Sequence, residues 1–364
     1  MVAAGFHSLT LAEVQRETED AVCLRFEVPP ALAATFAFTQ GQYLTLRRDL
    51  DGEDVRRSYS ICSGVDDGEL RVAVKRIEGG RFSTWANDEL TVGTAVEVMP
   101  PAGSFHTPLA AEHDKNYLCI AAGSGITPVL SIVKSILSRE PRSHVTLLYG
   151  NQKVASIMFR ETLERLKNRY MARFQLIHVL SREHRDVDIL NGRIDNRKGA
   201  ALCRNLLDLS AVDEFFLCGP EGMISEVSRG LRGAGVDEAR IHYELFGASA
   251  ADAAAAILRH QARARRYGGK VSRVTVKADG RETVFDLSPD GENILDAALE
   301  AGVDLPFACK GGACATCKAR VTHGEVEMDV RHALEDSEIA AGFVLSCQAH
   351  PLSDEVTLDF DRAV

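Results

Sequence analysis

The sequence predicts three domains in series: an antiparallel β-barrel, an α/β doubly wound domain with a parallel sheet, and a small α+β domain. The chain of 364 residues is long enough for two or three domains. Strand-like alternation fills the first part, strand–helix alternation the middle, and a cysteine-rich loop the last part. The predicted domains are 1–107, 108–247 and 271–364, with a linker at 248–270.

The first domain is predicted from short segments in which polar and apolar residues alternate. Turn-forming Gly, Asp and Pro residues separate these segments, which read AVCLRFEV, GQYLTL, RRSYSICS, GELRVAVKRI and TAVEVMP. Several short strands at this spacing are typical of a barrel or a sandwich.

The middle of the chain alternates between buried-looking strands and amphipathic helices. The predicted strands are NYLCIAAG, HVTLLYGN, RFQLIHVLS and DEFFLCGP. The predicted helices are TPVLSIVKSILSR, SIMFRETLERLKNRY and EGMISEVSRGLRGAG. This alternation implies a parallel sheet with helices on both faces, which IHYELF is expected to close near residue 246.

The predicted linker carries a run of alanines, which we expect to form a helical turn or two, and a local basic run. The basic residues are Arg259, Arg263, Arg265 and Arg266. A nucleic-acid contact is one interpretation of this run, and a solvated connector is the favoured one. After the linker, VSRVTVKADG and RETVFDLS predict a hairpin, NILDAALEAG predicts a helix that stops at Gly302, and DEVTLDF predicts a final strand.

The acidic charge of the chain is concentrated in its last domain. Residues 271–364 hold 8 Lys and Arg against 18 Asp and Glu, whereas residues 1–270 hold 34 of each class. Nucleic acid is therefore an unsuitable partner, because phosphates require cations. Docking onto a basic protein surface is favoured, and the alternative is that the charge only aids solubility.

The sequence predicts neither a membrane span nor a secretory leader. No run of about eighteen apolar residues is present, and the N-terminus lacks a basic segment followed by an apolar one. The nine cysteines are an odd number in a long chain. This favours a reducing compartment, the cytoplasm, over a disulfide framework.

The cysteine-rich loop CKGGACATCKA has the spacing of an iron–sulfur site. Cys309, Cys314 and Cys317 follow C-x4-C-x2-C, and Cys347 follows in VLSCQAHP. This spacing matches that of plant-type [2Fe–2S] ligands. The small residues between the cysteines leave room for backbone N–H groups to point at sulfur. A zinc site or plain buried thiols are the alternatives, but zinc sites usually need two C-x2-C pairs.

Two segments of the first domain suggest a flavin site. In RRSYSICS, Arg57 is expected to pair with the flavin phosphate, Tyr59 to stack on the ring, and Ser60 to bond near its N5 atom. The alternative is an ordinary exposed strand. In VKRIEGGRFST, the pattern V-K-x4-G-x2-S adds a close backbone approach at Gly80 and a helix opened by Ser83 and Thr84, whose N-terminus is expected to bind phosphate. Its residues are Val74, Gly80, Ser83 and Thr84.

A glycine turn in the middle domain suggests a nicotinamide dinucleotide site. Gly123, Gly125 and Pro128 form G-x-G-x-x-P between a predicted strand and a predicted helix. Pro128 is acceptable at the first helical position. A plain tight turn is the alternative.

The residues after the third strand of this sheet suggest which dinucleotide binds. Ser181 and Arg182 lie where a doubly wound fold meets the adenosine ribose, and Arg193 adds a second cation. An acidic residue there would indicate NADH, so this pair favours the 2′-phosphate of NADPH. Surface arginines and NADH remain the alternatives.

The remaining cysteines divide into one candidate site residue and four core residues. Cys218, followed by Gly219, ends a strand at the predicted ligand edge, where its thiol is expected near the nicotinamide ring or simply buried. The predicted core cysteines are Cys23, Cys62, Cys119 and Cys203.

These motifs, in this order, resemble the ferredoxin–NADP reductase superfamily with a plant-type ferredoxin fused behind it. Among its members the chain is most similar to the family of phenylacetyl-CoA epoxidase reductase subunits. The resemblance implies a flavin barrel, a β-grasp ferredoxin domain, and electron flow from NADPH through FAD and [2Fe–2S] to a separate di-iron oxygenase. The reductase of a Rieske-type ring or steroid hydroxylase, and a non-catalytic assembly subunit, remain the alternatives.

The resemblance also implies roles for individual residues. Tyr59, Ser60, Cys218 and Glu244 are expected to act at the flavin and nicotinamide rings, with Phe246 as an aromatic neighbour. FAD rather than FMN rests on this resemblance. The dinucleotide is expected to lie against Gly123, Gly125, Thr127, Pro128 and Gly219.

Overall fold

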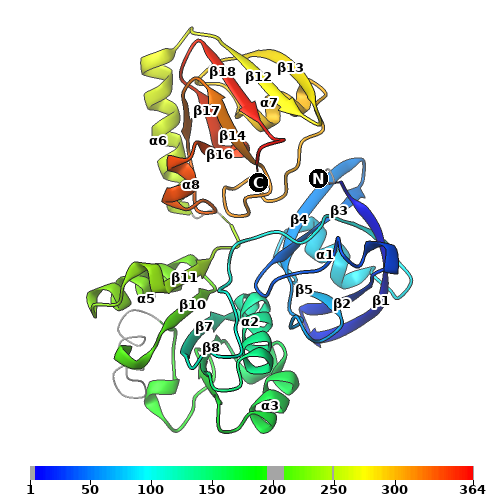
Figure 1. Ribbon diagram of the computed structural model, residues 1–364, viewed down its shortest axis with the longest axis vertical. Coiled ribbons are helices and arrows are strands. Elements are labelled where there is room, and N and C mark those ends of the chain that lie inside the picture. Colours follow the sequence, from blue (N-terminus) through cyan, green and yellow to red (C-terminus); the bar gives the residue numbers. More distant parts are fainter. Residues whose placement is uncertain (1–4, 195–208, 248–249, 364) are drawn as a thin grey trace. The chain divides into compact units, whose positions relative to one another are not determined.

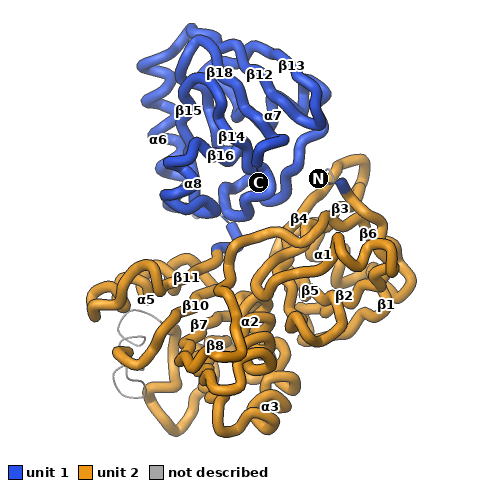
Figure 2. The backbone as a smooth tube through the Cα atoms, viewed as in Figure 1, with its two compact units in different colours: residues 1–5, 245–364 blue, residues 6–244 orange. Residues whose placement is uncertain are grey.

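The computed structural model describes residues 5–194, 209–247 and 250–363 (Figure 1). The chain divides into two compact units (Figure 2). The larger unit spans residues 6–244, and the C-terminal unit spans residues 245–364 together with residues 1–5. Within the described ranges, no helix is long and apolar enough to cross a membrane.

The first part of the larger unit is a closed antiparallel barrel. Its strands are β1 (His7–Thr18), β2 (Ala21–Glu27), β3 (Tyr43–Leu50), β4 (Glu53–Ser60), β5 (Leu70–Lys75) and β6 (Ala95–Val98), in the order β4-β3-β6-β1-β2-β5. Ile61 follows β4 directly and bridges Val72 of β5, which joins the two edges of the sheet. Helix α1 (Arg81–Asp88) packs against this barrel through Phe82 and Trp85.

The second part of the larger unit is a parallel sheet in doubly wound order. Its strands are β7 (Asn116–Ala122), β8 (His144–Asn151), β9 (Phe174–Leu180), β10 (Glu214–Cys218) and β11 (Ile241–Glu244), in the order β11-β10-β7-β8-β9. The described helices are α2 (Ile126–Arg139), α3 (Arg160–Arg169) and α5 (Glu221–Gly233). The carboxyl ends of the strands meet at one edge, which is where such sheets bind ligands.

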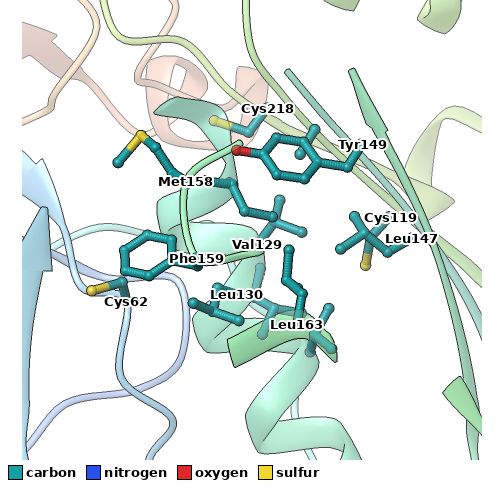
Figure 3. Close-up of a cluster of buried hydrophobic side chains, with 14 of the residues drawn as sticks. Cys62, Cys119, Val129, Leu130, Leu147, Tyr149, Met158, Phe159, Leu163 and Cys218 are labelled. Carbon is teal, nitrogen blue, oxygen red and sulfur yellow. The ribbon is translucent and has the colours of Figure 1, made fainter. Parts of the chain in front are cut away.

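Three of the four predicted core cysteines are buried in the larger unit. Cys23, Cys62 and Cys119 belong to a cluster that joins α2 to both the barrel and the sheet (Figure 3). Cys203 lies outside the described residues. The buried cysteines are therefore packing residues, as predicted from their apolar neighbours.

The C-terminal unit is a mixed sheet with a helix against it. The sheet holds β12 (Ser272–Ala278), β13 (Arg281–Leu287), β14 (Lys318–His323), β16 (Phe343–Leu345) and β18 (Glu355–Asp359), in the order β13-β12-β18-β14-β16. The smaller elements are α7 (Ile294–Glu300), α8 (Asp336–Ala340), β15 (Val326–Met328) and β17 (Ala349–Pro351). As predicted, β12 and β13 form a hairpin, and Gly302 follows α7 with a φ of +85°.

The segment predicted as a linker contains a long helix instead of one or two helical turns. Helix α6 (Ala250–Tyr267) has 18 residues and belongs to the C-terminal unit. Alanine has the highest intrinsic helix propensity, so the alanine run favours this helix. The helix also has a tertiary anchor, because the side chain of Arg263 is only 2% exposed and pairs with Glu327 and Asp329.

Glu214 stabilises the start of β10 as a charged group. Its carboxylate accepts hydrogen bonds from Lys115 at 2.6 Å, Thr107 at 3.1 Å and His242 at 3.0 Å. Burial raises the pKa of Glu214, but the bonds from His242 and Lys115 outweigh it and hold the pKa at about 2. A depressed carboxyl pKa stabilises the fold above the pKa of the unfolded chain, and this contribution is lost as the pH falls toward about 2.

Replacing Glu214 with Gln is therefore expected to lower the free energy of unfolding by about 2 kcal/mol at pH 7. The gap to the wild type should narrow as the pH falls below about 4.5, because the carboxylate then becomes protonated in the unfolded wild-type chain while it stays charged in the folded one. Thermal unfolding followed from pH 7 to pH 3 measures this. Glu112→Gln, at an exposed carboxylate, is the matched control. A gap that stays constant over this range would contradict the expectation.

Candidate functional site

Strand β4 presents the first group of predicted site residues on the barrel. Arg57 is exposed, Tyr59 is half-buried and Ser60 is buried. Arg57 and Tyr59 lie two positions apart and therefore share one face of the strand. The Tyr59 ring lies 5.6 Å from that of Phe82, and burial raises the pKa of its hydroxyl, which stays protonated.

The structure brings two predicted residues together across the larger unit. The Ser60 hydroxyl donates a hydrogen bond to the Glu244 carboxylate at 2.8 Å, although 184 residues separate them. Glu244 ends β11, and the parallel register pairs it with Cys218 of β10. Burial raises the pKa of the Cys218 thiol, and the charge of Glu244 raises it further. Cys218 is thus a neutral, fully buried thiol in the apolar cluster (Figure 3).

Phe246 is not joined to this pair by any described contact within the larger unit. It belongs to the C-terminal unit, and its side chain is 48% exposed. Its predicted place beside the flavin therefore remains a prediction.

The turn before α1 has a compact internal structure. The Ser83 hydroxyl accepts a hydrogen bond from the Ile77 N–H at 3.1 Å and donates one to the Gly80 carbonyl at 3.2 Å. A Cβ added at Gly80 would lie 2.5 Å from Ser83 Oγ, so the turn requires glycine. The helix begins at Arg81, two residues before the predicted start at Ser83.

These contacts limit how the turn can hold a ligand. The Ser83 hydroxyl is used within the turn, and the Val74 side chain is fully buried in the barrel core. A ligand could therefore be held by the N–H groups at the start of α1 rather than by these two side chains. Thr84 is exposed, so its hydroxyl is accessible.

The glycine turn after β7 interlocks with the loop after β10. Gly123 has a φ of +55°, and its carbonyl accepts a hydrogen bond from the Tyr149 hydroxyl at 3.0 Å. A Cβ added at Gly125 would lie 2.2 Å from the Cys218 carbonyl oxygen, and one at Gly219 would lie 3.1 Å from Ala122 Cβ. Both glycines are therefore required by close backbone packing rather than by flexibility.

The first turn of α2 is held by Thr127, whose hydroxyl donates to the Ser124 carbonyl at 3.0 Å. Pro128 is the third residue of α2, not the first as predicted, because a short 3₁₀ turn over Gly123–Gly125 precedes the helix. The position is still within the first turn, where a backbone N–H has no partner inside the helix.

The residues predicted to select the dinucleotide lie at the ligand edge of the sheet. Ser181 and Arg182 follow β9, and their N–H groups donate to the carbonyls of Asn151 and Gln152, each at 2.9 Å. Arg182 and Arg193 are exposed. A bridge between Leu180 and Asn191 returns the loop that carries Arg193 to the end of β9.

Asn151, at the end of β8, is a residue at this edge that no sequence pattern singled out. Its side chain is 8% exposed, and its amide nitrogen has no hydrogen-bond partner among the described residues. A buried amide without a partner is unusual in a folded protein. Only tertiary structure reveals such a group, since the sequence shows just another strand end.

The four predicted metal ligands converge in the C-terminal unit as two pairs. Cys309 interacts with Cys314, and Cys317 interacts with Cys347. Within each pair the sulfur interaction separates the thiol pKa values. It lowers the pKa of Cys314 to about 6 and raises that of Cys309; it also lowers the pKa of Cys347 and raises that of Cys317. Each pair therefore brings two thiol sulfurs close enough to interact.

Backbone N–H groups point at these sulfurs, as the small residues of the loop predicted. Gly311 N–H donates to Cys309 Sγ at 3.3 Å, and Cys309 N–H donates to Cys314 Sγ at 3.5 Å. A further N–H bond from Gly312 lowers the pKa of Cys347. These donors stabilise thiolates, which are the form that binds iron.

The loop has a strained backbone wrapped around a small volume. Lys310 and Ala315 have φ values of +50° and +47°, which residues other than glycine rarely adopt. Gly312 has a φ of +75°, and a Cβ there would lie 2.8 Å from Val330 Cγ1. Strain of this kind persists where the surrounding structure enforces it, commonly at a ligand site.

The chemistry of this donor set fits a two-iron cluster better than a single metal. Over the described ranges, no three His, Cys, Asp or Glu side chains are disposed around one metal position. The four thiols instead form two pairs, and a [2Fe–2S] cluster takes two ligands on each of its irons. A zinc site would gather all four around one ion.

Family comparisons match all three parts of the chain. Residues 8–107 match the model of an oxidoreductase FAD-binding domain, residues 119–229 that of an oxidoreductase NAD-binding domain, and residues 276–352 that of a 2Fe-2S iron-sulfur cluster binding domain. These matches agree with the barrel, the parallel sheet and the cysteine loop, in the predicted order.

Several curated proteins are similar to the chain over nearly its whole length. A component of the 1,2-phenylacetyl-CoA epoxidase of Escherichia coli is 46% identical over 98% of both chains. The ferredoxin reductase component of 3-ketosteroid-9-alpha-monooxygenase from Rhodococcus rhodochrous is 35% identical over 97% of this chain and 96% of its own. The glycine betaine monooxygenase reductase subunit of Pseudomonas aeruginosa is 32% identical over 98% of this chain and 96% of its own.

Solved structures share the fold. Phthalate dioxygenase reductase, described as a modular structure for electron transfer from pyridine nucleotides to [2Fe-2S], covers 98% of both chains with a TM-score of 0.59 at 23% identity. The match to an intact type IV self-sufficient cytochrome P450 monooxygenase covers 97% of this chain and 41% of that protein. Its TM-score is 0.69 at 20% sequence identity. At these identities the likeness concerns the fold alone.

Proposed function

The chain belongs to the family of reductase components of multicomponent oxygenases, in which electrons pass from a pyridine nucleotide through FAD to a [2Fe–2S] centre, and we propose that it serves a di-iron phenylacetyl-CoA epoxidase with NADPH as donor. The two cysteine pairs carry the proposal, because they supply ligands for a one-electron centre in a chain that also contains a nucleotide-binding sheet. The acceptor is proposed from the 46% identical relative.

The residues of the larger unit have distinct proposed tasks. Arg57 pairs with the flavin phosphate, and Tyr59 lies along the flavin ring while its buried hydroxyl keeps its proton. Ser60 and Glu244 hold a proton between Oγ and Oε2, 2.8 Å apart, beside the reacting rings. When bound, FAD accepts two electrons together and releases them singly, as a [2Fe–2S] centre requires.

The glycine turn has the task of bringing backbone N–H groups close to a pyrophosphate. The close packing of Gly125 on the Cys218 carbonyl fixes the start of α2 against the end of β10. A helix N-terminus held in this way attracts anions. Cys218 contributes an uncharged, fully buried side chain to this contact, which keeps the region dry.

The acidic part of the C-terminal unit that follows α6 is the proposed docking element for the oxygenase. Residues 271–364 carry 18 acidic against 8 basic side chains, so a basic surface is the complementary partner. The proposed location is the cytoplasm, which is supported by the free thiols of all eight described cysteines.

Reconstitution with a purified oxygenase tests the proposed function. The chain loaded with FAD and iron should oxidise NADPH in the presence of the di-iron epoxidase and phenylacetyl-CoA, with product formed in proportion. The 35% identical relative makes a steroid hydroxylase the second candidate acceptor. Coupling to a steroid or Rieske-type hydroxylase instead would replace the proposed acceptor. A purified protein without the visible absorption of a flavin or an iron–sulfur cluster would favour an assembly role and contradict the electron-transfer role.

Replacing Arg182 with Ala is expected to raise the KM for NADPH by roughly 10- to 100-fold and leave that for NADH nearly unchanged. A charged hydrogen bond to a phosphate contributes about 1.5–3 kcal/mol. Steady-state kinetics with both nucleotides, and with a dye that accepts electrons from the flavin, measures the change. Arg185→Ala, at an exposed arginine on the same loop, is the control. An unchanged preference for NADPH would remove the proposed phosphate site.

A further inference from the structure

Arg263 of α6 is buried in a way that neither its sequence neighbours nor the proposed electron path explains. Its guanidinium donates to Glu327 at 2.7 Å and to both oxygens of Asp329, at 2.7 and 3.1 Å. The other arginines of the basic run, Arg259, Arg265 and Arg266, are exposed. Burying an arginine is costly unless it is well paired, so this contact has a specific structural effect.

Asp329 connects this arginine to β17 of the C-terminal unit. His350 Nε2 lies 3.2 Å from its second oxygen, and Arg259 donates to its carbonyl. Burial raises the pKa of Asp329, but the bonds from His350 and Arg263 outweigh it and hold the pKa at about 2. Asp329 is therefore a buried carboxylate that remains charged and is fixed from two elements, α6 and β17.

The backbone around Asp329 supports the cysteine loop directly. Asp329 N–H donates to the Gln348 carbonyl at 2.9 Å, and the Gln348 side chain donates to the Lys310 carbonyl at 2.9 Å. The next residue, Val330, lies so close to Gly312 that any side chain there would clash. A displacement of Asp329 would thus move the support of both Lys310 and Gly312.

We propose that Arg263 is a positioning residue for the iron–sulfur loop: through Asp329 it fixes the strip of backbone on which Gly312 and Gln348 rest. The inference rests on the proposed [2Fe–2S] site, to which it adds α6 as a structural part. Helix α6 would then stabilise the iron–sulfur loop rather than serve only as a connector between the two units. Groups that orient a metal site in this way commonly affect metal retention by 10- to 100-fold.

The test compares full-length, cluster-loaded variants for the rate at which a chelator bleaches the iron–sulfur absorption at 25 °C. Arg263→Gln and Asp329→Asn should each accelerate the loss by roughly 10-fold. Arg265→Gln, at an exposed arginine of the same helix, should lose its cluster at the wild-type rate. The double variant should be no faster than the faster single one, because both break the same contact.

Further measurements separate positioning from a general charge effect and from loss of folding. A pure charge effect would lower the cluster midpoint potential in Arg263→Gln, raise it in Asp329→Asn, and leave cluster loss unchanged; this result would overturn the proposal. So would additive acceleration in the double variant, or equal acceleration in Arg265→Gln. If Arg263→Gln does not fold, Arg263→Lys takes its place with an intermediate expected rate, and a wild-type rate there overturns the proposal.

The iron content of the wild type distinguishes failure of this inference from failure of the proposed function. A wild type without iron removes the [2Fe–2S] site itself. The cluster requires about two irons per chain. If the wild type contains them and the variants lose them at the wild-type rate, only the role of Arg263 is removed.

Discussion

Replacing Cys347 with Ala is expected to abolish cluster incorporation and to reduce electron delivery to one-electron acceptors by more than about 100-fold. Cys347 is 3% exposed and pairs with Cys317, so its loss leaves one of the two sulfur pairs incomplete. A small dye that takes electrons directly from the flavin should still be reduced at the wild-type rate. Iron analysis, visible absorption and acceptor assays measure these outcomes.

The control for this prediction is a buried cysteine that belongs to no pair of the loop. Cys119→Ala removes a fully buried thiol from the core of the larger unit and should retain iron. Full iron content and full one-electron transfer in Cys347→Ala would contradict the ligand assignment. Loss of dye reduction in the same variant would show that the effect had spread beyond the C-terminal unit.

Replacing Gly125 with Val is expected to slow flavin reduction by NADPH by about 100-fold or more. The φ of Gly125 is −59°, so the backbone itself accepts other residues. The obstacle is space, because the new Cβ would lie 2.2 Å from the Cys218 carbonyl oxygen and 2.7 Å from the Gly219 nitrogen. Overpacking of this kind costs about 1–3 kcal/mol and must open the turn that is proposed to receive the pyrophosphate.

Stopped-flow reduction of the bound flavin at varied NADPH measures the effect. Gly222→Val is the matched control, because a Cβ at Gly222 meets nothing within 4 Å. Thermal unfolding of both variants separates a local effect from loss of the fold. Wild-type reduction by Gly125→Val would show that the interlocked turns have no part in nucleotide binding.

Motifs whose chemistry depends on local spacing were predictable from the sequence. The loop from Cys309 to Cys317 folds as its small residues indicated, since N–H donors and thiols lie within a few positions of one another. The order of strands and helices followed from hydrophobic periodicity in the same way. Strand β1 was missed because few of its 12 residues are buried, which weakens the alternation. Strands β14 to β17 of the C-terminal unit were also not predicted.

Features that depend on contacts between distant segments were not predictable. The length of α6 and the burial of Arg263 arise from Glu327 and Asp329, more than sixty positions away. The hydrogen bond between Ser60 and Glu244 similarly joins two ends of the larger unit. Family resemblance placed Glu244 near the flavin strand, whereas the residues alone gave no reason for it.

Glu244 has a further consequence because of where it lies in the chain. It is the last residue of the larger unit, so the polypeptide leads directly from the carboxylate that holds Ser60 to the iron–sulfur unit. A shortened protein for use without iron should therefore end after Gly247, since a chain terminus at Glu244 would add a second negative charge beside Ser60.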